Sequence, residues 1–202
     1  MPELYSMDTG LLPTQIPVID NNDQVMKDIL ACSLQKIDYS SYINKRFYYF
    51  ISHNTLNNSY DTDYILIDTI LSVLSANDFL IKEHPIAFNT PSVNYPLSQY
   101  EPSVFVDRRN YMLESLYSCI DLTEKILITR GSATVLHPKY MFNQEPYVIF
   151  TYMLYSPDNV TNEAKLAEDL ISCYIDKSKI FIPESITDFK NVLLSFASNI
   201  NK

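Results

Sequence analysis

Apolar residues recur every three or four positions over much of the chain, the spacing that places them on one face of an α-helix. The segment 61–76 is apolar on nearly every side, which is typical of a helix covered by its neighbours. Ser185 and Asp188 form a capping-box pattern at the start of another helix, and Gly131 is placed to end one as its C′ residue. The pattern as a whole predicts helices over residues 20–37, 40–53, 61–76, 107–130, 161–175 and 185–200.

Four shorter segments are less regular, and each of them admits a strand. The aromatic run over 47–50 suits a strand as well as a helix, because aromatic residues are enriched in sheets. Residues 79–81 and 133–137 predict short strands. Residues 145–155 stay open between the two states, since Pro146 favours a helix start while the β-branched and aromatic residues favour a strand.

These elements together predict a mainly α fold. About six helices would surround the central apolar helix at 61–76, with room for a small β-sheet. Residues 1–19 contain prolines and no apolar period, so they predict an extended N-terminal arm before a single domain over 20–202. Prolines recur again through 84–106, which predicts a long loop or arm, unusually long for a compact domain.

A weak internal repeat links two parts of the chain. Several residues of segment 61–95 recur 53 positions later in segment 114–150, including the His-Pro pair at 84–85, which matches the pair at 137–138. Such a match is typical of a duplicated helix–strand unit whose copies pack together. The alternative is chance, because Tyr, Ile and Leu are common in this chain.

The composition excludes several classes of function. The 202 residues carry a formal net charge of −9, which disfavours nucleic-acid binding, because phosphate contacts need clustered Lys and Arg. The chain holds two glycines, Gly10 and Gly131, so neither a Walker A loop nor a glycine-rich dinucleotide-binding loop can form. Neither a signal-peptide pattern nor an apolar run of about 18 residues is present. We therefore expect a soluble intracellular protein, in the cytoplasm of its host or producing cell or packaged in a virion.

No set of residues has the spacing of a catalytic or metal-binding motif. His84 and His137 with Asp68 and Asp121 would offer imidazole and carboxylate ligands to zinc or iron, but none lies within helical reach of another. The three cysteines are widely spaced, which is typical of small buried side chains in a reducing compartment. We expect no catalytic, cofactor-binding or metal-binding residues.

Tyrosine is the most informative residue type. The chain has 16 Tyr and 10 Phe, and such aromatic residues are enriched in protein–protein interfaces. Residues with AT-rich codons also far outnumber those with GC-rich codons, which indicates an AT-rich genome such as that of a phage, a large virus or a low-GC microbe, and this bias enriches tyrosine too. The expected contact residues, in the loops and the proline-rich arm, are Tyr95, Tyr100, Tyr140, Pro91 and Pro96.

Three hypotheses for the function follow from these features. The preferred one is a non-enzymatic structural or assembly protein, such as a connector or ring subunit of a virion or bacteriophage, whose partners are other protein subunits, its own copies included. The first alternative is a small helical regulatory protein that binds a host or cellular partner. The second is an enzyme whose catalytic residues carry no recognisable motif. None of the three requires a cofactor, a membrane or direct contact with nucleic acid.

Overall fold

The computed structural model describes residues 23–25, 28–29, 39–51, 60–84, 97–109, 113–155 and 160–198, and short strands alternate with helices along these ranges. The strands are β1 (Phe47–Phe50), β2 (Phe79–Lys82), β3 (Phe105–Asp107), β4 (Ile126–Thr129), β5 (Tyr147–Phe150) and β6 (Ile180–Phe181). The α-helices are α2 (Ser40–Ile43), α3 (Tyr60–Val73), α4 (Leu113–Tyr117), α5 (His137–Phe142), α6 (Thr161–Cys173) and α7 (Ile186–Ser198). Single 3-10 turns are η2 (Ala76–Asp78), η4 (Leu97–Gln99), η5 (Ala133–Val135), η6 (Tyr152–Leu154) and η8 (Lys177–Lys179).

The strands form one six-stranded sheet in the order β3-β2-β1-β4-β5-β6, and every neighbouring pair is parallel. The central strands start level with one another, because Phe47 of β1 lies opposite Phe79 of β2 and Ile126 of β4. All carboxyl ends therefore meet at one edge, which we call the carboxyl edge, and all strands start at the opposite, amino edge. The fold is α/β with a parallel sheet at its centre, so the predicted mainly α fold is wrong.

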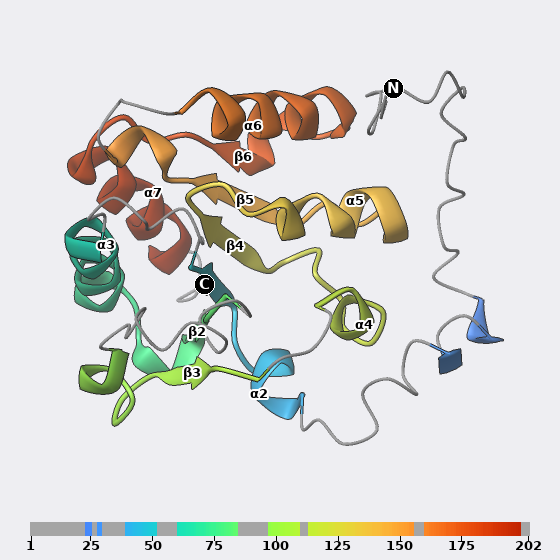
Figure 1. Cartoon of the computed structure of the whole chain (residues 1–202), viewed down its shortest axis with the longest axis horizontal. Coiled ribbons are helices and arrows are strands. Elements are labelled where there is room, and N and C mark those ends of the chain that lie inside the picture. Colours follow the sequence, from blue (N-terminus) through green and yellow to red (C-terminus); the bar gives the residue numbers. More distant parts are fainter. Residues whose placement is uncertain are drawn as a thin grey trace.

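Helices cover the sheet on both faces. Alternate residues of a strand point to opposite sides, so each face presents apolar side chains that a layer of helices can bury. On one face, Phe47 and Tyr49 of β1 and Ile128 of β4 pack with residues of α3 and α7. On the other face, Tyr48 of β1 and Leu127 of β4 pack with residues of α4, α5 and α6. Figure 1 shows α3 and α7 together on the left of the sheet, with α4 and α5 on its right.

The short strands explain why helical spacing dominates the sequence pattern. Strands β1, β2 and β4 are buried at all four positions, so they appear as short runs without polar alternation. Parallel strands that are covered on both faces have this character. A run of four apolar residues fits a buried strand and one turn of a buried helix equally well, and it carries too few residues to show a period.

Several predicted elements are confirmed. The helices over 61–76, 161–175 and 185–200 form α3, α6 and α7, and the strand over 79–81 forms β2. The Ser185 hydroxyl caps α7: it accepts a hydrogen bond from the backbone N–H of Asp188 at 3.1 Å. Helix α3 is not central, however, since it lies in an outer layer.

Other predictions are wrong or are now decided. The helix over 107–130 is wrong, because this stretch runs from the last residue of β3 through α4 to β4, and Gly131 follows a strand. Of the helix over 40–53, only the first residues are helical, and the aromatic run is β1, as its strand alternative held. The strand over 133–137 is wrong, since these residues form η5 and start α5. The open segment 145–155 contains strand β5.

The predicted arms and repeat are described only in part. The arm over 1–19 and most of the helix over 20–37 lie outside the described residues. Of the arm over 84–106, the part from Leu97 onward packs into the core of its own domain and then joins the sheet as β3. The two His-Pro pairs hold different positions, because His84 follows β2 after one residue whereas His137 is the first residue of α5.

Candidate functional site

Buried polar side chains gather at the carboxyl edge. An ionised or polar side chain is costly to bury unless it is paired, so the positions where a fold accepts this cost are informative. Among the described residues, every buried polar or charged side chain except that of Ser115 lies at or just beyond the end of a strand, or in the first turn of a helix that leaves the carboxyl edge: Asp63, Lys82, Glu83, Asp107, Thr129, Thr151 and Glu163.

The strand order places a switch point at the centre of this edge. Strands β1 and β4 are neighbours, but the chain leaves β1 toward α3 on one face and leaves β4 toward α5 on the other. In open parallel sheets the diverging connections leave a crevice there, and ligands bind in it. The residues around this point form what we call the switch-point cluster: Tyr49, Asp63, Thr129, Arg130, Gly131, Thr151, Tyr155 and Glu163.

Asp63 is the buried acid of the switch-point cluster. It lies in the first turn of α3, and its side chain is held by two tyrosines from other elements, since the hydroxyls of Tyr49 and Tyr155 both donate to Oδ1 of Asp63. The two hydroxyl oxygens lie 3.2 Å apart. Burial and the neighbouring Asp63 raise the pKa of Tyr155 well above its usual range, so this tyrosine keeps its proton and acts as a donor.

Arg130 is the cation of the switch-point cluster and follows β4 directly. Its side chain is 11% exposed, and Nε lies 3.3 Å from Oε1 of Glu163, whose side chain is 4% exposed. The guanidinium carbon lies 4.7 Å from the centre of the Tyr155 ring, so the cation also faces an aromatic surface. Nε itself has no hydrogen-bond partner in the described residues, because the ion pair lacks hydrogen-bond geometry.

Gly131 permits this arrangement. A Cβ atom added to Gly131 would overlap Cγ of Glu163 and lie 3.0 Å from its Cβ. Any side chain at this position would therefore displace Glu163 from Arg130. The close approach of a helix side chain to backbone, and not the end of a helix, accounts for one of the two glycines in the chain.

A second polar group lies at the ends of β2 and β3. The Nζ of Lys82 donates to the carbonyl oxygen of Arg109 at 2.6 Å, and burial lowers the pKa of this lysine. Asp107 accepts hydrogen bonds from the Tyr42 hydroxyl at 2.6 Å and from Nε of Arg109 at 2.9 Å. These contacts tie the ends of two neighbouring strands together, so a structural role explains them.

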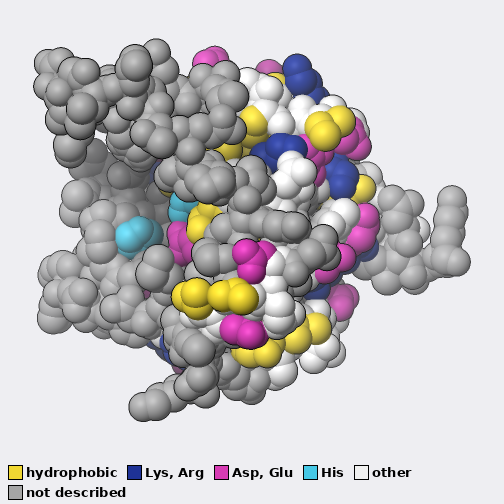
Figure 2. Space-filling view, turned by 90° about the vertical axis from the view of Figure 1, so that its right-hand side faces the viewer, with side chains coloured by type: hydrophobic (Ala, Val, Ile, Leu, Met, Phe, Trp, Pro, Cys, Tyr) yellow, Lys and Arg dark blue, Asp and Glu magenta, His cyan; other side chains and the backbone are white. Residues whose placement is uncertain are grey.

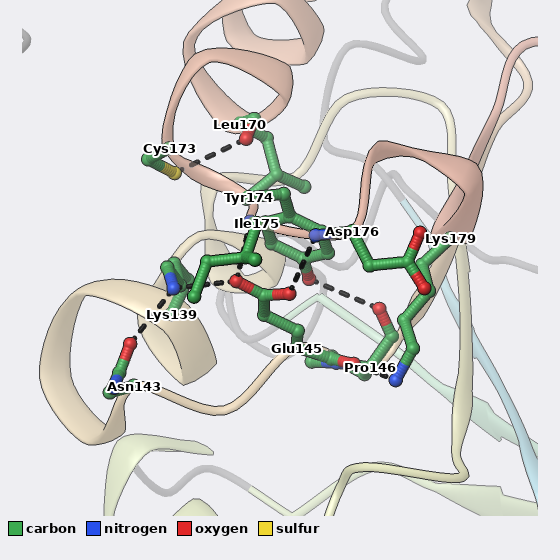
Figure 3. A network of polar contacts seen from close by, with 10 residues as sticks. All are labelled: Lys139, Asn143, Glu145, Pro146, Leu170, Cys173, Tyr174, Ile175, Asp176 and Lys179. Atoms are coloured by element: carbon green, nitrogen blue, oxygen red, sulfur yellow. Dashed lines mark hydrogen bonds and ion pairs between the residues drawn. The ribbon is translucent and has the colours of Figure 1, made fainter.

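The opposite edge holds a cavity of about 670 Å³, but its polar groups bind each other. The Glu145 carboxylate accepts hydrogen bonds from Lys139 Nζ at 2.6 Å and from the backbone N–H of Ile175 at 2.8 Å (Figure 3). Lys179 Nζ donates to the carbonyl oxygen of Glu145 at 2.9 Å. These contacts hold together the loops that enter β5 and β6. The cavity is therefore at the amino edge, whereas the buried polar groups of the switch point are at the carboxyl edge.

The structure places three of the four residues that were weighed, and not adopted, as metal ligands. His137 Nδ1 pairs with Glu114 at 2.5 Å, while Asp68 accepts a hydrogen bond from the Tyr100 hydroxyl at 2.9 Å. Asp121 lies before β4, at the amino edge. Across the described residues, no three His, Cys, Asp or Glu side chains are arranged to hold a metal ion.

The predicted contact residues are only partly described. Tyr100 is 6% exposed and belongs to the core, so a contact role would require its segment to leave the domain. Tyr140 lies on α5 and is partly buried against the apolar residues on the sheet face that α4, α5 and α6 cover. Tyr95, Pro91 and Pro96 lie outside the described residues.

Sequence reasoning missed the switch-point cluster. Asp63 has the appearance of an ordinary first-turn acid, because the helix dipole favours carboxylates there. A usable signal was present nonetheless: three short apolar runs each end in polar residues, at 82–84, 107–109 and 129–132. Charged residues at the same end of several buried strands mark the carboxyl edge of a parallel sheet, once the runs are recognised as strands.

Comparisons with family models, with curated proteins and with solved structures return no match to this chain. None of the helices in the described part of the chain has the length and apolar character needed to cross a membrane.

Figure 2 shows acidic and basic side chains interspersed on the side that faces right in Figure 1.

Proposed function

We propose that the protein binds a small polar molecule at the switch point of its carboxyl edge, with Arg130 as the anchoring group. The observation that carries this proposal is the concentration of buried polar side chains at that edge among the described residues. Structural ties between the ends of β2 and β3 account for part of this concentration. The rest lies at the switch point between β1 and β4, which is where open parallel sheets bind ligands, because the connections diverge there.

Arg130 has unused capacity to bind a ligand. A guanidinium carries five N–H donors in a planar fork, and the ionic partner that the described residues give Arg130 is Glu163. The buried Nε–H of Arg130 lies beside Glu163 without a hydrogen bond among the described residues, and a buried donor without an acceptor is costly, so an oxygen of a ligand or of water is expected near this ion pair. The Thr151 hydroxyl, buried at the end of β5, likewise has no hydrogen-bond partner among the described residues.

The test is a fragment screen by two-dimensional NMR on ¹⁵N-labelled full-length protein. Hits should shift the amide signals of Gly131, Ser132 and Thr151, and Arg130→Met should abolish those shifts while leaving the rest of the spectrum in place. Lys190→Met, at an exposed position on α7, is the matched control and should change nothing. Hits confined to the amino edge, around Lys179, would contradict the proposal.

The assembly role expected from composition stays a prediction. An extended arm over 84–106 would favour that role by reaching a neighbouring subunit, but the described part of this arm, from Leu97 onward, packs on its own domain. Light scattering over a hundredfold concentration range addresses it directly. A discrete oligomer would favour that role, and it would be compatible with a ligand site in each copy.

A further inference from the structure

The switch-point cluster carries more negative than positive charge. Asp63 and Glu163 contribute two carboxylates, and Arg130 contributes one cation. Asp61 adds a further acid in the first turn of α3. Tyr155, which donates to Asp63, is neutral, since burial and Asp63 raise its pKa. Among these described residues, an incoming anion would therefore meet more carboxylates than cations, and the carboxylates would repel it.

The place where comparable folds bind phosphate is unsuited to it here. Phosphate binds where a glycine-rich turn after the first strand leads into a helix N-terminus, since backbone N–H groups and the helix dipole attract it. Between β1 and α3 this chain has no glycine, and the first turn of α3 carries Asp61 and Asp63. The dipole that would attract phosphate already interacts with these carboxylates.

We propose that the ligand is an uncharged polyhydroxyl compound, a sugar or a nucleoside without a phosphate group; this rests on the proposed function. A hydroxyl donates a hydrogen bond through its proton and accepts one through its oxygen. It can therefore donate to Asp63 or Glu163 and accept from Arg130 in the same site.

The two kinds of group have separate roles in selecting the ligand. Arg130, seated over the Tyr155 ring, binds hydroxyl or ring oxygens and sets the position of the ligand. Glu163 has two effects: it orients Arg130 through the ion pair, and its charge rejects phosphorylated forms of the same ligand. Removing the charge of Glu163 while keeping its shape should therefore widen specificity toward phosphate esters, which a purely structural residue would not do.

The experiment compares matched pairs that differ by one phosphate. D-ribose, ribose 5-phosphate, adenosine and adenosine monophosphate are titrated into the full-length protein, and binding is followed from the amide signals of Gly131 and Ser132. We expect ribose, adenosine or both to bind, with the phosphate ester at least roughly tenfold weaker, from one added repulsion at short range. Ribose alone would indicate a sugar site, and tighter binding of adenosine would indicate a nucleoside site.

The variant Glu163→Gln supplies the second arm. Relative to each parent compound, it should strengthen binding of the matching phosphate ester roughly tenfold, whatever its effect on the affinity for ribose and adenosine themselves. Glu168→Gln is the matched control, since Glu168 lies on the exposed side of the same helix, and it should leave all four affinities unchanged.

Two results would overturn this inference. One is equal or tighter binding of the phosphate esters by the wild-type protein, and the other is no response to any of the four compounds at millimolar concentration. Either could occur while the fragment screen still places hits at Gly131 and Thr151, in which case the binding site stands and only the ligand class fails. Absence of any fragment at the carboxyl edge would instead remove the proposed function itself.

Discussion

Replacing Gly131 with alanine tests whether the packing at the switch point is as close as described. The new Cβ would overlap Cγ of Glu163 and stand 3.0 Å from its Cβ, well inside the contact distance of about 3.5–4.0 Å between carbon atoms. Glu163 is 3% exposed and lies in the first turn of α6, so it cannot swing freely into solvent. Either α6 moves or Glu163 leaves Arg130.

The expected cost comes from two physical sources. Overpacking a tight site costs about 1–3 kcal/mol, and weakening a buried ion pair adds to it, since loss of one partner costs about 3–5 kcal/mol. Because Glu163 is displaced and not deleted, we expect Gly131→Ala to lower the free energy of unfolding by about 2–4 kcal/mol. For a chain of this size that corresponds to a fall in Tm of about 5–15 °C.

The assay is urea unfolding followed by circular dichroism, run as a double-mutant cycle with Glu163→Ala. In the Glu163→Ala background the overlapping Cγ is gone, so Gly131→Ala should cost less than about 1 kcal/mol there. The coupling between the two positions should therefore exceed about 1 kcal/mol. Equal costs in both backgrounds would refute the argument that Gly131 exists to admit Glu163.

Three further perturbations test other parts of the structure. Tyr155→Phe removes a donor from buried Asp63 and should cost about 1.5–3 kcal/mol of unfolding free energy in urea; a cost below about 0.5 kcal/mol would contradict the hydrogen bond. The close contact with His137 lowers the pKa of Glu114 below its ordinary 4.5, so the pair stabilises the fold above that value and loses its effect as the pH falls. The difference in stability between wild type and His137→Gln should therefore shrink as the pH falls below 4.5. Burial lowers the pKa of Lys82 from 10.5, so just below pH 10.5 the unfolded chain binds more protons than the folded protein does. The free energy of unfolding should therefore rise as the pH rises toward 10.5, and Lys82→Met should flatten this rise relative to wild type.

Much of the local structure follows from the sequence. Helices α6 and α7 are predicted by the helical spacing of 161–175 and 185–200 and by the cap at Ser185. Each has one solvent-exposed and one buried face, and each is long enough for the apolar period to be visible in the sequence. The two glycines exclude a glycine-rich phosphate loop, and the acidic first turn of α3 is consistent with that exclusion. Both results rest on properties that a short stretch of chain carries by itself.

The sheet and the site depend on the tertiary structure. A four-residue apolar run has no period, so β1, β4 and β5 become strands through their pairing with one another, and the residues they pair lie far apart along the chain. The contact between Asp63 and Tyr155 spans 92 residues, and it exists because the strand order brings the start of α3 beside the end of β5. Sequence spacing records which residues share a face of one element. The packing of the whole chain decides which elements become neighbours. The switch-point cluster depends on this packing, because its residues come from different elements.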